Sequence, residues 1–168
     1  YSYELPEDDG DFTICTARCW NRDGSPHDTF LQAHCTVTKT DKFKNPREIS
    51  FFNAHGNKTL QRIPGGGIAH SIKSEYQNRL RTSRILFDCN GKPAAGESPN
   101  RTECKFDLKN RLIKESFFKG DTLAVNPETN VAETRWEYDP ATEKLHAVRY
   151  FNEQLNPCKN SSGYAALI

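Results

Sequence analysis

The sequence predicts an α+β, β-rich fold, in which a small disulfide-stapled amino-terminal domain (one helix plus strands) precedes a carboxy-terminal antiparallel β-sandwich. Three observations lead to this expectation. One segment combines cysteines with the start signals of a helix, short β-type runs dominate elsewhere, and a turn-rich segment divides the chain. We therefore expect domains at residues 1–89 and 103–168, joined by a loop or linker at 90–102.

The predicted helix lies in the segment from Cys15 to Cys35. Ser25 suits the N-cap position, Pro26 suits the first helical position, and Asp28 can close a capping box. The residues that then share one helical face are Phe30, Leu31, His34 and Cys35. We expect this helix, held by cystines, to anchor the amino-terminal domain.

Short runs of β-forming residues, separated by turn residues, predict the strands of both domains. Before the linker, strands are expected at 36–40, 48–52, 59–63, 68–72 and 83–89. After it, a β-meander is expected, with strands near 104–108, 111–118, 122–125, 131–138 and 144–151. No fixed repeat period is visible.

The six cysteines, none in a CxxC pair, indicate disulfides rather than a zinc site. Cys89 and Cys104 flank the turn-rich segment and are natural partners. Cys158 must then reach back to one of the upstream cysteines, which are Cys15, Cys19 and Cys35.

Secretion is the expected localisation. The chain contains sequons for glycosylation at Asn57, Asn100 and Asn160, and sequons together with disulfides are typical of extracellular proteins. The absence of Met at position 1 leads us to expect that the chain has been trimmed. No apolar run approaches the roughly 20 residues that a membrane span requires.

The charge balance gives no reason to expect nucleic acid or an anionic membrane as a partner, because the net charge is only +1. One segment is nevertheless locally basic, with Lys73, Arg79, Arg81 and Arg84 around Tyr76. It predicts either a solvated face or a patch that binds an anion or a partner.

No hydrolase or metal motif occurs, so we expect no catalytic residue, metal or cofactor. One alternative is a secreted hydrolase of ribonuclease type, whose base, acid and phosphate-binding groups would come from His70, Glu75, Arg79 and His146. Another is a carbohydrate-binding or protease-inhibitor module. Its sugar platform would require Trp136 and Tyr138 to be exposed, whereas their alternation with Ala132 favours burial.

The spacing of Cys15, Cys19 and Cys35, followed by strands and a separate β-meander, resembles the dual-domain effectors that vascular-wilt fungi secrete into xylem. This resemblance implies removal of a signal peptide and a pro-segment before Tyr1. It also implies a virulence role, with recognition by plant immune receptors, and carries no catalytic residues over.

The expected function is therefore that of a secreted, monomeric virulence effector that binds host plant proteins and modulates immunity or cell death. Its site of action after secretion, outside or inside host cells, stays open. Binding determinants are expected on the last hairpin, whose mixed charges suit specific pairing, although the same charges would also solvate a sheet. The candidate residues are Glu133, Arg135, Glu137, Lys144 and Arg149.

Overall fold

The computed structural model describes residues 2–3, 7–27, 33–63, 67–96 and 98–167. All regular elements in these ranges are β-strands, and no helix in them is long and apolar enough to cross a membrane. The chain divides into two compact units, Tyr1–Ala95 and Gly96–Ile168. The division falls inside the segment expected as a linker, the end of which already belongs to a strand.

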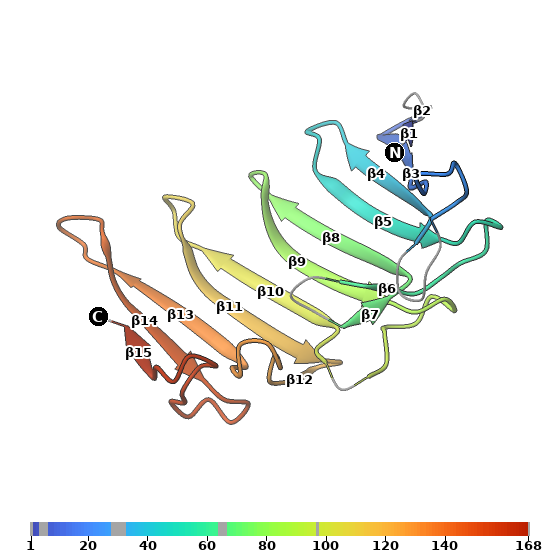
Figure 1. Ribbon diagram of the computed structural model, residues 1–168. Helices are drawn as coiled ribbons and strands as arrows, with labels where there is room; N and C mark the ends of the chain where they lie inside the picture. The colour runs from blue at the N-terminus through green and yellow to red at the C-terminus, as the bar shows by residue number, and fades with distance from the viewer. Residues whose placement is uncertain (1, 4–6, 28–32, 64–66, 97, 168) are drawn as a thin grey trace. The chain divides into compact units, whose positions relative to one another are not determined.

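Unit 1 is an antiparallel sheet made of successive hairpins (Figure 1). Its strands lie in the order β1, β3, β4, β5, β8 and β9; β2 pairs with β3, and β6 with β7. Their bounds are Ser2–Tyr3 (β1), Glu7–Asp9 (β2), Phe12–Arg18 (β3), Cys35–Asp41 (β4), Pro46–Phe52 (β5), Gln61–Arg62 (β6), Ile68–Ala69 (β7), Ser71–Gln77 (β8) and Leu80–Phe87 (β9).

Unit 2 repeats this construction with strands in the order β10, β11, β13, β14 and β15, while β12 pairs with β11 (Figure 1). Its described strands thus form one sheet, not two packed sheets. The bounds are Arg101–Phe106 (β10), Leu112–Lys119 (β11), Thr122–Leu123 (β12), Glu133–Tyr138 (β13), Leu145–Phe151 (β14) and Ala166–Leu167 (β15). The predicted hairpin at 131–138 and 144–151 is confirmed by the pairing of β13 with β14.

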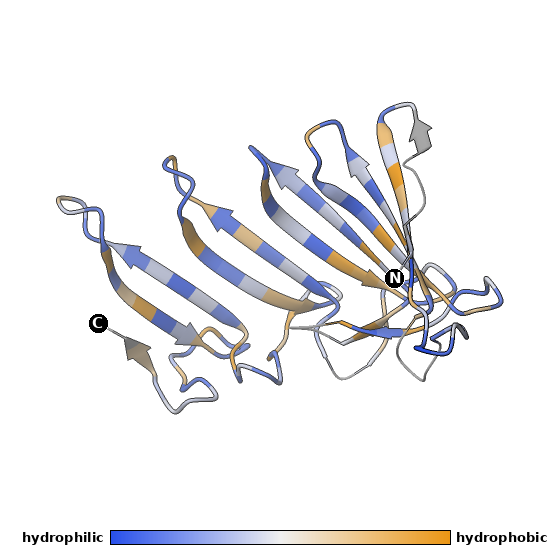
Figure 2. Cartoon of the chain, turned by 45° about the horizontal axis from the view of Figure 1, so that its top comes forward, coloured by the Kyte–Doolittle hydropathy of each residue, from blue (hydrophilic) through white to orange (hydrophobic). Residues whose placement is uncertain are grey.

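Polar and apolar residues alternate along many of these strands, as Figure 2 shows. Because successive side chains of a strand point to opposite faces, this alternation gives each sheet two chemically different faces. The register of the hairpins therefore decides which side chains become neighbours.

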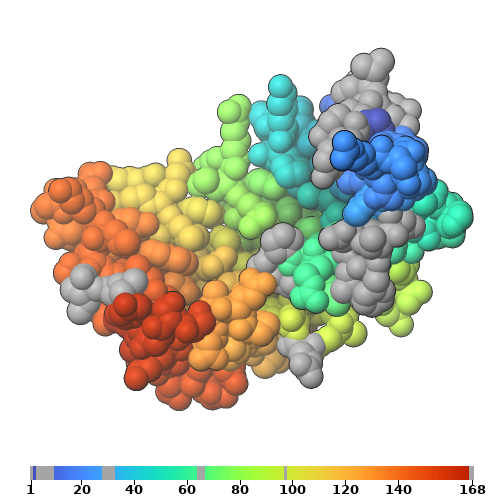
Figure 3. Space-filling view, in the orientation of Figure 1, coloured from blue at the N-terminus to red at the C-terminus, as the bar shows by residue number. Residues whose placement is uncertain are grey.

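Six described turns share one arrangement, in which the first residue is Asp or Asn and its side chain hydrogen-bonds to the backbone of the same turn. Its Oδ1 accepts hydrogen bonds from the backbone N–H groups two and four residues later, and the residue three positions later has a positive φ. These turns begin at Asp41, Asn53, Asp88, Asp107, Asn152 and Asn160. The β4–β5 and β8–β9 turns project side by side from unit 1 in Figure 3.

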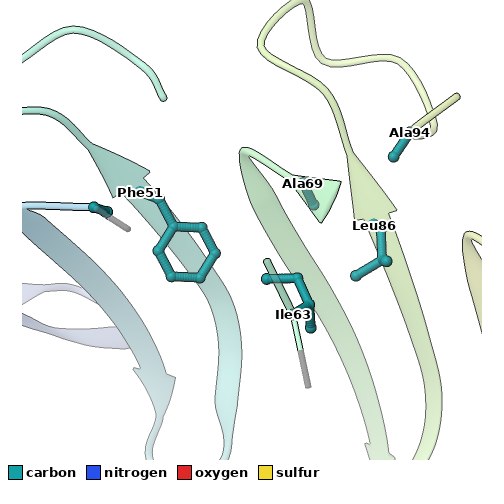
Figure 4. Close-up of a cluster of buried hydrophobic side chains, with 6 residues drawn as sticks. Phe51, Ile63, Ala69, Leu86 and Ala94 are labelled. Atoms are coloured by element: carbon teal, nitrogen blue, oxygen red, sulfur yellow. The ribbon is translucent and has the colours of Figure 1, made fainter. Parts of the chain in front are cut away.

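The described core of unit 1 lies where β5, β8 and β9 meet. Ile49 pairs with Ile72, which in turn pairs with Leu86 on the next strand. The cluster around them contains Ala33, Phe51, Ile63, Ala69, Leu86 and Ala94, most of which Figure 4 shows. Burial of a Leu, Ile or Phe side chain stabilises a fold by about 1.5–3 kcal/mol, so this cluster holds the middle strands together.

The predicted amino-terminal helix is wrong. Pro26 lies in a β-bridge and Cys35 begins β4, while residues 28–32 lie outside the described part of the chain. The Ser25 hydroxyl donates a hydrogen bond to Asp23 Oδ1 at 2.6 Å. The group that was expected to cap a helix is therefore part of a β-turn.

The predicted disulfide staple is also wrong, because the described residues contain no disulfide bond. The cysteines concerned, all described, are Cys15, Cys19, Cys35, Cys89, Cys104 and Cys158. For two of them the register gives the reason: Cys15 lies opposite Thr38, whereas Cys35 lies opposite Arg18. These positions are about 10 Å apart along the strands and face opposite sides of the sheet, beyond the reach of a disulfide.

We expect the replacement Asn53→Ala to lower the free energy of unfolding by about 1 kcal/mol, since it removes the acceptor of two backbone hydrogen bonds. In the structure, Asn53 Oδ1 accepts from the His55 and Asn57 N–H groups at 3.0 and 2.9 Å. Urea denaturation measures the change. Asn53→Asp keeps the oxygen and is the control; equal losses in the two variants would contradict a closing role for it.

Candidate functional site

The open strand face of unit 2 carries a row of charged side chains drawn from three strands. Pairing places Lys114 of β11 opposite Arg135 of β13, and Arg135 opposite Arg149 of β14. Glu133 and Glu137 belong to the same face because they lie two positions from Arg135. We call these five residues the charged ladder.

Glu133 is the buried centre of the ladder, with only 1% of its side chain exposed. Its Oε2 accepts a hydrogen bond from Ser116 Oγ at 2.9 Å and lies 2.5 Å from Lys114 Nζ, while Oε1 lies 2.6 Å from Arg135 Nε. Burial alone would raise the pKa of Glu133, but the bonds from Lys114, Arg135 and Ser116 outweigh it and lower the pKa. Glu133 is therefore an ionised carboxylate whose oxygen atoms both have partners.

The outer half of the ladder is solvated. Arg149 binds Glu137 through two nitrogen atoms, Nε at 2.7 Å and Nη2 at 3.2 Å, and the two side chains are 48% and 44% exposed. The hydrogen bond from Arg149 holds the pKa of Glu137 below its usual value. The Arg135 guanidinium lies over the Phe151 ring, 4.3 Å from its centre. Each of these long side chains is thus held in one orientation.

The structure brings three of the residues predicted for the partner surface, Arg135, Glu137 and Arg149, onto one strand face. Glu133, also predicted for that surface, is buried. Lys144 lies apart from the ladder, in the turn before β14, where its carbonyl accepts from the Asp139 N–H. Lys114 and Ser116 were missed, since only the pairing of β11 with β13 brings them to Glu133.

The three predicted sequons differ in accessibility. Asn57 is exposed. Asn100 is only 8% exposed, and its Oδ1 accepts from the Gly120 N–H at 3.2 Å. Asn160 uses its Oδ1 to close a turn. Asn57 is therefore the candidate best placed for a glycan.

The residues of the catalytic alternative are spread over both units. His70 is buried, with Nδ1 3.3 Å from the Thr59 carbonyl, whereas His146 is exposed in unit 2. Among the described residues, no group of three or more His, Cys, Asp and Glu side chains is arranged to hold a metal ion.

The aromatic residues of the sugar-platform alternative are half-buried. Tyr138 donates a hydrogen bond to the Leu112 carbonyl at 3.1 Å, and the Arg111 guanidinium covers its ring at 4.3 Å. Trp136 pairs with Val148 on the neighbouring strand. The Tyr138 ring is therefore covered on one face by Arg111, and the Trp136 ring is only partly exposed.

The locally basic segment forms the β8–β9 hairpin, and its basic side chains lie in different surroundings. Lys73 lies over the Phe87 ring, and Arg84 pairs with Ser74. Tyr76 and Arg79, in contrast, line a cleft at the tip of the hairpin. Of this basic segment, the described tip thus contributes Tyr76 and Arg79 to a cleft.

We expect Glu133→Gln to lower the free energy of unfolding by about 2 kcal/mol at neutral pH, since it removes buried charge-assisted hydrogen bonds. The solvated pair suggests a control, Glu137→Gln, for which we expect a loss of at most about 1 kcal/mol. Urea denaturation at several pH values tests both.

The contribution of Glu133 is present above the pKa of an unfolded Glu and disappears as the pH falls through the lowered pKa of the folded state. The difference between wild type and Glu133→Gln should therefore shrink in acid. A difference that is equal at pH 7 and pH 3 would contradict this account.

Comparison with known proteins adds no identification. The sequence matches no model of a protein family, and no curated protein matches it. Since the described residues contain no helix, the resemblance to fungal effectors rests on cysteine spacing and the division into two parts.

Proposed function

We propose that this chain is a secreted binding protein that recognises host plant proteins through the charged ladder, in the manner implied by its resemblance to fungal effectors. The observation that carries the proposal is the ordered row of charges from Lys114 to Arg149 on one strand face. Within it, opposite charges alternate along β13 at Glu133, Arg135 and Glu137, and three of the ladder side chains are between 42% and 48% exposed.

Such a row suits protein recognition for two reasons. The side chains are already fixed by one another and by Phe151, so a partner that binds them costs less side-chain entropy than it would on a mobile surface. Arginine is also enriched at protein interfaces, where a planar guanidinium contacts carboxylates and aromatic rings. The pattern of charges then contributes more to specificity for the partner than to affinity.

The role in virulence, through modulation of immunity or cell death, is part of the same proposal and comes from the resemblance alone. Secretion is consistent with the exposed sequon at Asn57. The solvated Arg149–Glu137 pair allows a direct test, because its two charges can be exchanged without loss of the ion pair.

We expect the exchange Glu137→Arg with Arg149→Glu to abolish the effect of the secreted chain on cell death in leaf tissue, measured as ion leakage. Melting temperature should change little, because the exchanged pair keeps its attraction.

The matched control exchanges an exposed ion pair of unit 2 that links the β10–β11 turn to the β13–β14 turn, Lys109→Glu with Glu143→Lys. This variant should behave as wild type. Equal activity of both exchanged variants, or equal loss in both, would refute recognition by the ladder.

A further inference from the structure

A second candidate site lies in unit 1, independent of the ladder, between the tips of two neighbouring hairpins. The antiparallel pairing of β5 with β8 brings the β4–β5 and β8–β9 turns to the same end of their strands (Figures 1 and 3). Between them is a cleft of about 340 Å³, within the size range of small-molecule sites. Its lining residues are Phe43, Asn45, Arg47, Tyr76, Asn78 and Arg79.

The wall formed by the first turn is held in place by Asp41. Its carboxylate accepts from Arg47 Nε at 2.8 Å and from Asn45 Nδ2 at 3.0 Å. Burial would raise the pKa of Asp41, but these bonds and those from the turn backbone lower it to about 2. Arg47 also lies over the Tyr76 ring, 5.3 Å from its centre. In the described part of the chain it hydrogen-bonds only through Nε, so its two terminal nitrogen atoms are available to a ligand.

The opposite wall carries the side chain of Arg79. Arg79 makes no hydrogen bond or ion pair with any described residue. It occupies the second position of the two-residue turn Asn78–Arg79, with φ values of 51° and 65°. Glycine is the usual residue at this position, because a side chain is strained there. The hairpin thus places a guanidinium group at the cleft, on a strained backbone and without an acidic partner among the described residues.

The two turn segments that form the cleft carry a net positive charge. The two segments that form it, 41–47 and 76–81, contain five basic residues and one acidic residue, Asp41. The remaining lining groups are neutral: two carboxamides and two aromatic rings, of which Phe43 is 53% exposed. The site offers guanidinium groups for an oxyanion, amides for hydroxyl groups and an open ring for an apolar face.

We propose that this cleft binds an acidic saccharide, with the carboxylate of a uronic acid between Arg47 and Arg79. A carboxylate accepts two parallel hydrogen bonds from a guanidinium. The hydroxyl groups of the sugar match the carboxamide of Asn78, and the C–H face of the ring can lie against Phe43. An inorganic anion would leave the amides and the aromatic ring unused.

Isothermal titration calorimetry on the full chain tests the proposal with three probes: trigalacturonate, the neutral galactotriose and inorganic phosphate. Only trigalacturonate should bind, and added salt should weaken it. Arg79→Gly should raise its Kd by about tenfold or more, since it removes a charge-assisted hydrogen bond. Because glycine relieves the strained turn, the melting temperature of this variant should equal or exceed that of wild type.

The matched control is Arg22→Gln, which removes the same charge from the turn at the other end of the β3–β4 strands. It should bind trigalacturonate as wild type does. The proposal is refuted if trigalacturonate does not bind, if galactotriose or phosphate binds as tightly, or if Arg79→Gly binds as tightly as wild type.

Discussion

Hydrogen bonds from an Asp or Asn side chain to its own turn fix the length of the β4–β5 and β10–β11 hairpins, where the side chains are those of Asp41 and Asp107. One residue more or less in a turn would move every following side chain to the other face of the sheet. The cleft depends on the Asp41 turn, which positions Arg47. The ladder depends on the turn at Asp139, whose Oδ1 accepts from the Ala141 and Thr142 N–H groups and so aligns β13 with β14.

Local turn and strand signals decide which parts of the fold could be predicted from the sequence. The β13–β14 hairpin was predictable, because alternating side chains and an Asp-Pro turn are local signals. The helix was not, because Ser25 and Pro26 suit a turn as well as an N-terminus, and the chain after Cys35 is rich in β-branched residues. The turns share an Asx residue, but their left-handed position holds Gly in only three of six cases. An Asp or Asn residue alone is therefore a weak sequence signal for these turns.

The candidate sites were predictable only where strand pairing is local. Alternation places Arg135 and Glu137 on one face, but it does not show that Lys114 and Ser116 enclose Glu133. That enclosure needs the pairing of β11 with β13 across a connection without a regular sequence signal. The cleft likewise combines Arg47 with Arg79, which only the β5–β8 pairing brings together.

The two sites differ in how their charges are balanced. In the ladder, the two carboxylates of Glu133 and Glu137 neutralise part of the charge of Lys114, Arg135 and Arg149. The surface therefore presents a specific pattern of charges with a small net charge. In the cleft, Asp41 neutralises Arg47 but nothing described neutralises Arg79. A cation that is held in a strained turn without a partner is stabilised when a ligand supplies the opposite charge. The ladder is thus suited to selecting a protein by the pattern of its charges, and the cleft to binding an acidic saccharide through its unneutralised cation.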